Sequence, residues 1–228
     1  MSSDRQSVMR DAHESDVGAG GFPSWLRRER HGQGDERGAV AVEAAFIFPI
    51  FILILFGIIE FSLFLRDHVA LSAAVRSGAR TASAEPRMET FATDAAAAVL
   101  RAGTGMPFSS VDEMWIYEAS PAGYPANVGP GQLPRNSNAN TFTTCTSNCL
   151  VFTYSDSSFT QTGGEWDELE INACPGDVDM SNVGIYIRAN HRFVSGIFGT
   201  SVTITDHAVL RFEPIPASQL LQSGQCKP

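Results

Sequence analysis

Residues 44–65 read AAFIFPIFILILFGIIEFSLFL, and this stretch decides the class of protein. It holds 22 residues with a single charged side chain, Glu60. As a helix it would extend about 33 Å, at about 1.5 Å per residue, which is enough to cross the hydrocarbon core of a bilayer. A chain of 228 residues is too small to bury so apolar a helix on all sides. The sequence therefore predicts one transmembrane helix, which we place at residues 39–65.

The charges around this stretch give the expected orientation and exclude one class of partner. Arginines stand on both sides of it, with a slight excess before it, which favours a cytoplasmic N-terminus. The net charge is -9 and the only lysine is Lys227, so the chain lacks the basic face that a nucleic-acid-binding protein needs. We expect a single-pass protein of the cell membrane with membrane lipids as partners and an extracytoplasmic C-terminal domain. The arginines closest to the stretch are Arg27, Arg28, Arg30, Arg37, Arg66, Arg76 and Arg80.

The cysteines Cys145, Cys149, Cys174 and Cys226 all follow the apolar stretch. Their even number and loop-like neighbours favour two disulfides in an oxidising compartment over four free thiols. A zinc site is the third alternative, but the closest pair is not a CxxC and has no histidine nearby. Four cysteines allow three pairings. We prefer Cys145–Cys149, because closing a short loop costs little entropy, and this leaves Cys174–Cys226.

The rest of the chain predicts an α+β fold: a long N-terminal transmembrane helix, an extracytoplasmic helical segment and a small antiparallel β-sheet domain. We expect the first helix to reach about Ala82, Pro86 to break it, and a second helix at 86–102 that ends at Gly103 and packs on the sheet. The expected organisation is as follows: a disordered cytoplasmic leader at 1–38, the transmembrane helix at 39–65, extracytoplasmic helices at 66–103, the β domain with its disulfides at 104–216 and a tail at 217–228.

Strands are predicted from alternating apolar residues and turns from clusters of small polar ones. A strand is expected from Val111 to Tyr117, and another at 149–154, CLVFTY. Alternation at 183–187 and 208–212 predicts an antiparallel hairpin that closes the domain. Residues 120–144 are rich in Pro, Gly, Asn and Ser and are expected to form a loop, and Gly163-Gly164 to form a turn.

No constellation of residues predicts catalysis, a metal site or a cofactor. His191 and His207 fall on the two final strands, where they could be cross-strand neighbours, but we expect them on an ordinary solvated face. Residues 177–188 begin like a calcium loop, yet they lack the glycine and the final glutamate that such a loop needs. No Gly-x-Ser-x-Gly elbow occurs. We therefore expect that the protein is not an enzyme.

The boundary before the apolar stretch carries a more informative motif. Glu43 follows Gly38 by five residues and stands just inside the apolar region, where a carboxylate is costly and usually functional. The alternative is that Glu43 simply reaches the headgroup layer.

The wider segment, RGAVAVEAAFIFPIFILILFGIIEFSLFLRDHVALSAAVRSGARTAS at 37–83, resembles the N-terminal signature of TadE-like proteins. The features that match are Gly38, Glu43, Pro49, the block at 56–61 and the triplet at 78–80.

The resemblance implies a minor pilin or pseudopilin of the tight-adherence (Flp-type) pilus apparatus. It implies a prepilin-type processing site, with cleavage by a prepilin peptidase between Gly38 and Ala39 and with Glu43 as the fifth mature residue. Other pilus-assembly subunits, and further copies of the chain itself, would then be its partners. The alternative function is a signal-anchored extracytoplasmic ligand-binding module or enzyme, with the β domain as its working part.

Overall fold

The computed structural model describes residues 33–125, 142, 144–177 and 180–215. These residues hold a long apolar N-terminal helix, a second helix and a five-stranded antiparallel sheet, which confirms the predicted α+β class. The chain divides into two compact units, Met1–Phe51 and Ile52–Pro228. The loop predicted at 120–144 falls largely outside the described residues, and the predicted tail at 217–228 lies wholly outside them.

Helix α1 spans Gln33–Ala84 and contains Pro49. Among the described residues it is the one helix that is long and apolar enough to cross a membrane. A helix satisfies its backbone polar groups within itself, so it can carry this sequence through lipid. The predicted disordered leader was wrong for residues 33–38, which are helical, because a nucleated helix extends at little cost into neighbouring polar residues.

Helix α2 spans Phe91–Ala102 and ends at Gly103, as predicted, but it begins later than the predicted residue 86. Residues 85–90 form turns instead, since Arg87 adopts a φ of +62°, which no helix accommodates. The Arg87 side chain donates from Nε to the carbonyl oxygen of Ile171 at 2.8 Å. The connection between the helices is thereby tied to the loop before the last hairpin.

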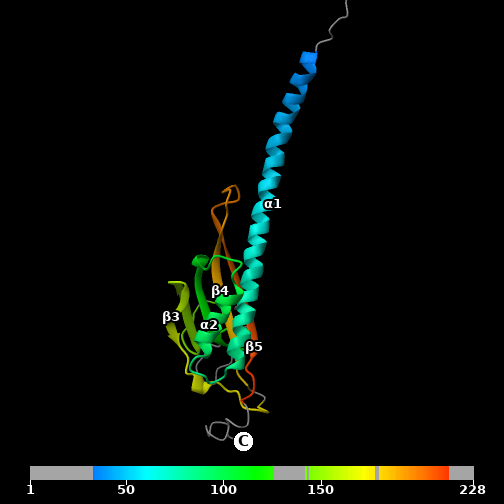
Figure 1. The fold of residues 1–228 in the computed structure, drawn as a ribbon. Coiled ribbons are helices and arrows are strands. Elements are labelled where there is room, and N and C mark those ends of the chain that lie inside the picture. The colour runs from blue at the N-terminus through cyan, green and yellow to red at the C-terminus, as the bar shows by residue number, and fades with distance from the viewer. Residues whose placement is uncertain (1–32, 126–141, 143, 178–179, 216–228) are drawn as a thin grey trace, which may run out of the picture. The chain divides into compact units, whose positions relative to one another are not determined.

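The sheet has the strand order β3-β2-β1-β4-β5, and every pair of neighbours is antiparallel (Figure 1). The predicted final hairpin is confirmed, because β4 and β5 pair along their full lengths from Asn182↔Arg211 to Arg192↔Ser201. The strands are β1 Val111–Ala119, β2 Cys149–Ser155, β3 Ser158–Glu165, β4 Asn182–Arg192 and β5 Ser201–Arg211.

The turn predicted at Gly163-Gly164 was wrong, because both glycines lie in the edge strand β3. The real turn is two residues long and comes earlier, at Asp156 and Ser157, which both have positive φ. Two positive φ values match the twist of a tight hairpin, although asparagine and glycine are the usual residues there. Gly164 has a φ of +80°, and a Cβ on it would approach the Cys149 carbonyl oxygen, so this irregular edge requires glycine.

The main hydrophobic core lies between the helices and one face of the sheet. Period-2 alternation sends Met114 and Ile116 of β1 and Ile185 and Ile187 of β4 to this side. Helix α2 contributes its buried face, and α1 contributes a buried stripe in its C-terminal half. The stripe of α1 is Ala70, Leu71, Ala74, Val75, Ala79 and Ala82.

The opposite face of the sheet carries a smaller aromatic cluster. Trp115 and Tyr117 of β1 and Tyr186 of β4 lie there, and the ring of Phe142 stacks on Tyr186 with centroids 3.9 Å apart. Burial raises the pKa of Tyr117, whose hydroxyl donates to the Gly123 carbonyl oxygen at 2.9 Å. Both faces of the sheet are therefore covered.

The predicted disulfide between Cys145 and Cys149 is present beside this cluster. Cys174 is also disulfide-bonded. Its predicted partner, Cys226, lies outside the described residues. No cysteine among the described residues is free.

Candidate functional site along α1

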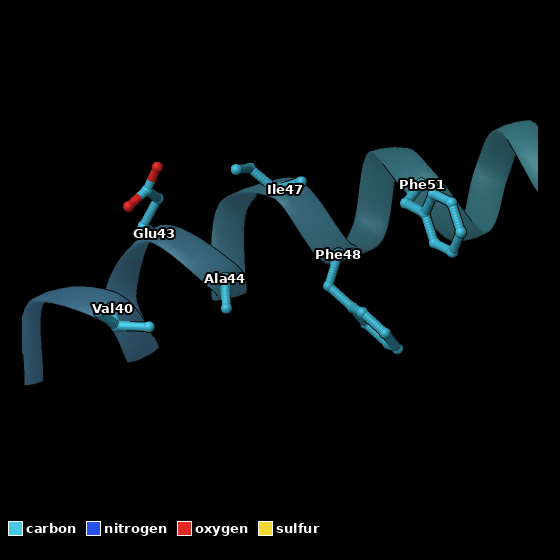
Figure 2. A pocket seen from close by; sticks show the side chains of 6 residues that line it. All are labelled: Val40, Glu43, Ala44, Ile47, Phe48 and Phe51. Atoms are coloured by element: carbon cyan, nitrogen blue, oxygen red, sulfur yellow. The ribbon is translucent and has the colours of Figure 1, made fainter. Parts of the chain in front are cut away.

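The first part of α1 presents the predicted processing residues on an open surface. Glu43 lines a shallow apolar groove, and Figure 2 shows its carboxylate pointing away from the helix. No described residue forms a hydrogen bond or ion pair with it. A carboxylate with no partner on an apolar helix is costly in lipid, so a partner outside this chain would stabilise it. The groove is lined by Val40, Glu43, Ala44, Ile47, Phe48 and Phe51.

Gly38 and Ala39 lie at the start of this exposed part of the helix. A Cβ built on Gly38 meets nothing within 4 Å, so packing among the described residues does not require glycine there. Ala39 and Glu43 are four residues apart, which places them on one side of α1 at about 6 Å along its axis. The residues predicted to form the processing site are thus accessible, and the fold gives no other reason for their identity.

Further along α1, a second set of polar residues is buried against the β4–β5 hairpin. Gly57, Glu60, Phe64, Asp67 and Leu71 recur at spacings of three and four residues, so they share one face of the helix. Glu60 is only 3% exposed. Its carboxylate accepts from the backbone N–H of Val194, at 3.1 Å, and from that of Ser195.

Asp67, two turns after Glu60, makes the second polar contact with the hairpin. Its Oδ2 lies 2.7 Å from Nδ1 of His191, and both side chains are buried. Arg66 also pairs with Asp67, at 2.9 Å from Nη2 to Oδ1. The ring of Phe64 meets the His191 ring edge-on with centroids 5.7 Å apart. The hairpin is therefore fixed to α1 by a row of alternating polar and aromatic contacts.

The expected solvated placement was wrong for His191 and right for His207, and the two are not cross-strand neighbours as they could have been. His191 pairs with Val202 and His207 pairs with Tyr186, so the two histidines are not cross-strand neighbours. His191 is 4% exposed rather than solvated, since it belongs to the face of β4 that meets α1. His207 is exposed, as expected, and its ring lies near the rings of Phe142 and Tyr124.

Sequence reasoning also missed the role of Glu60 and Asp67, although a signal was present. The two acidic residues are seven positions apart, and the intervening Phe64 continues the same stripe. Such spacing marks one helix face that meets a partner. What the sequence could not supply was the partner, because Val194, Ser195 and His191 are more than 120 positions away.

We predict that Glu60→Leu releases the hairpin end without unfolding the sheet. The leucine leaves the N–H groups of Val194 and Ser195 without an acceptor, and losing a hydrogen bond to a charged group costs about 1.5–3 kcal/mol. Amide hydrogen exchange at these two residues should accelerate, while the centres of β1 and β4 keep their protection. Glu89→Leu, at an exposed position, is the matched control. Unchanged exchange at Val194 and Ser195 would show that Glu60 does not hold the hairpin.

The fold and this helix define an α+β protein with a single-pass membrane anchor. Residues 38–80 match the family described as TadE-like protein, which confirms the resemblance inferred from the sequence. The match spans 43 of the 228 residues and holds both sets of α1 residues, whereas α2 and the sheet lie outside it. Comparisons with curated proteins and with solved structures gave no match.

Proposed function

We propose that the protein is a TadE-like minor pilin or pseudopilin, a structural or assembly component of a tight-adherence (Flp-type) pilus apparatus rather than an enzyme. The observation that carries the proposal is the family match at 38–80, which includes the whole apolar stretch at 44–65 and the motif from Gly38 to Glu43 before it. In this proposal residues 1–38 are cytoplasmic, α1 anchors the chain, and the sheet domain is extracytoplasmic. The disulfide supports that orientation, because such bonds persist in oxidising compartments.

In this proposal the two sets of α1 residues have different roles, one in the fold and the other in processing and assembly. Glu60 and Asp67 hold the hairpin of the same chain, so their charges serve the fold. A Cβ on Gly38 would meet nothing within 4 Å, and Glu43 is exposed. In the proposal, Gly38 is selected by the prepilin peptidase, and Glu43 receives the new amino group of Ala39 from a neighbouring subunit. Pairing the ammonium with the carboxylate would offset the cost of placing each at the edge of hydrocarbon.

We predict that Glu43→Gln leaves membrane insertion intact and impairs incorporation into the pilus complex. Glutamine keeps the size and the hydrogen-bonding capacity of the side chain but removes its charge, and the position is exposed, so the helix itself is not disturbed. Membrane fractionation and co-purification with the other subunits would measure the two effects separately. Glu43→Asp keeps the charge and should retain part of the assembly. Full incorporation of the glutamine variant would eliminate the charge-pairing role.

The alternative function is a signal-anchored ligand-binding module or enzyme. A deletion strain separates the two functions, since a pilus component is required for piliation whereas an independent module is not. We expect the deletion to lose surface pili and the full-length chain to restore them. Normal piliation in the deletion strain would favour the alternative.

A further inference from the structure

The end of the β4–β5 hairpin exposes three large apolar side chains within five residues. Val194 is 76% exposed, Ile197 is 52% exposed and Phe198 is 51% exposed. Scattered apolar residues are ordinary on a protein surface, but a cluster at the tip of a hairpin marks an interaction site. Outside α1, the exposed Met88, Leu169 and Leu210 stand apart from it in the sequence, and Val202 follows it on β5. We call Val194, Ile197 and Phe198 the hairpin tip.

The hairpin tip lies against the part of α1 that is predicted to be in the membrane. Glu60 accepts hydrogen bonds from the backbone of Val194 and Ser195, and a Cβ on Gly57 would lie 3.7 Å from the Phe198 ring. Figure 1 shows the hairpin, drawn in orange, running alongside α1. Gly57 and Glu60 precede Leu65, the end of the predicted span, by eight and five residues. That is about 7–12 Å along the helix axis, the depth at which interfacial groups sit in a bilayer.

Four backbone N–H groups of this loop have partners within the chain, which lowers the cost of placing them near the membrane. Irregular backbone is tolerated in lipid only where its N–H groups have partners. The N–H groups of Val194 and Ser195 bond to Glu60, that of Ile197 bonds to the Ser195 hydroxyl, and that of Phe193 bonds to the Thr200 carbonyl oxygen. The bonds from Val194 and Ser195 also solvate Glu60, the one charge of the apolar stretch. Glu60 and these two N–H groups thus lower each other's cost of approaching the membrane.

Basic side chains stand on the side of the tip that leads back to the sheet. Arg192 is exposed two residues before Val194, and the half-exposed Arg66 follows the apolar stretch on α1. Both line one surface cleft together with Asp67 and Asp112. Arginines directly above an apolar insertion are placed to meet lipid phosphates, while their alkyl stems cover apolar surface.

We propose that the hairpin tip is a second membrane contact, inserted into the interfacial layer of the leaflet that surrounds residues 57–65 of α1. The inference rests on the proposed membrane anchor and goes beyond it. One helix alone leaves a domain free to tilt and rotate over the bilayer, whereas two contacts fix its height and orientation. Leaving the membrane for an assembly would then require the tip to leave lipid together with α1.

Nitroxide labels on the full-length, oxidised chain in vesicles of phosphatidylethanolamine and phosphatidylglycerol test the inference. Ile197→Cys reports on the tip, Ile50→Cys on the centre of the apolar stretch, and Met88→Cys on the domain 28 residues beyond Glu60. All three positions are exposed, so labelling does not disturb a core. Spectra are compared with oxygen, which concentrates in lipid, and with a nickel chelate, which stays in water. We expect the oxygen-to-nickel accessibility ratio at 197 to be several-fold above that at 88.

The other outcomes contradict the inference and identify what fails. A label at 197 that is as accessible to nickel as the label at 88, with the label at 50 in lipid, leaves the anchor intact and overturns the second contact. A label at 197 that neither reagent reaches shows that protein, such as a second copy, covers the tip. A label at 50 that is open to water overturns the membrane anchor itself.

Discussion

In cells whose only copy of the protein carries Gly38→Leu, we expect the uncleaved chain to accumulate in the membrane and pili to be lost. In the proposed function the peptidase selects glycine at the residue before the cut, and a leucine side chain would not fit that position. The effect should be close to complete, because the scissile position is changed directly. Intact-mass measurement of the membrane fraction would show a chain that still carries residues 1–38.

The structure excludes misfolding as an explanation of that result. A Cβ on Gly38 meets nothing within 4 Å. Leucine is also a better helix former than glycine, by about 1 kcal/mol. Val40→Leu places a leucine two residues later at another exposed position and is the matched control. It should be processed normally. Normal cleavage of Gly38→Leu would remove Gly38 from the processing site.

The same substitution at Gly78 should instead unfold the domain and leave α1 in the membrane. Gly78 is buried where α1 meets α2 and β4. A Cβ there would come within 2.6 Å of Cγ2 of Val99 and 3.0 Å of Cδ1 of Ile185. Val99 is β-branched and fully buried, so it has no room to move. Overpacking typically costs about 1–3 kcal/mol, and a whole leucine at the contact between two helices belongs at or above the top of that range.

Denaturant unfolding of the detergent-solubilised chain, followed by tyrosine and tryptophan fluorescence, measures this loss. Gly38→Leu serves as the control, since it is the identical substitution in the same helix at an open position. Gly57→Ala is a milder control, because its Cβ would make only ordinary contact with Phe198 at 3.7 Å. A Gly78→Leu protein as stable as Gly38→Leu would mean that α1 and α2 are not packed as described.

Patterns among neighbouring residues predicted the long helix and the last hairpin, because their form depends mainly on hydrophobic periodicity. The apolar stretch specified the long helix, and alternation at 183–187 and 208–212 specified the last hairpin, which the structure confirms. Edge strand β3 was missed because Gly163-Gly164 reads as a turn, whereas pairing with β2 holds these glycines in the sheet. The late start of α2 depends on the positive φ of Arg87 and its bond to Ile171, neither of which leaves a local signal.

In the candidate site, too, the residues of a local motif could be recognised from the sequence, and those that depend on distant partners could not. Gly38 and Glu43 were recognisable because their motif is short and continuous. The buried contacts of Glu60 and His191 were not, because each needs a partner from the other end of the chain. A charge in an apolar run is therefore ambiguous in sequence alone. In this protein Glu60 has a partner within the fold, and Glu43 has none among the described residues.

N-terminal sequencing of the protein purified from its native envelope, in wild-type and peptidase-deficient cells, tests the proposed function most directly. The proposal predicts a membrane-bound chain that begins at Ala39 in the wild type and a chain that retains residues 1–38 when the peptidase is missing. A chain that retains Gly38 and the residues before it in both strains, beside normal pili, would contradict the proposal.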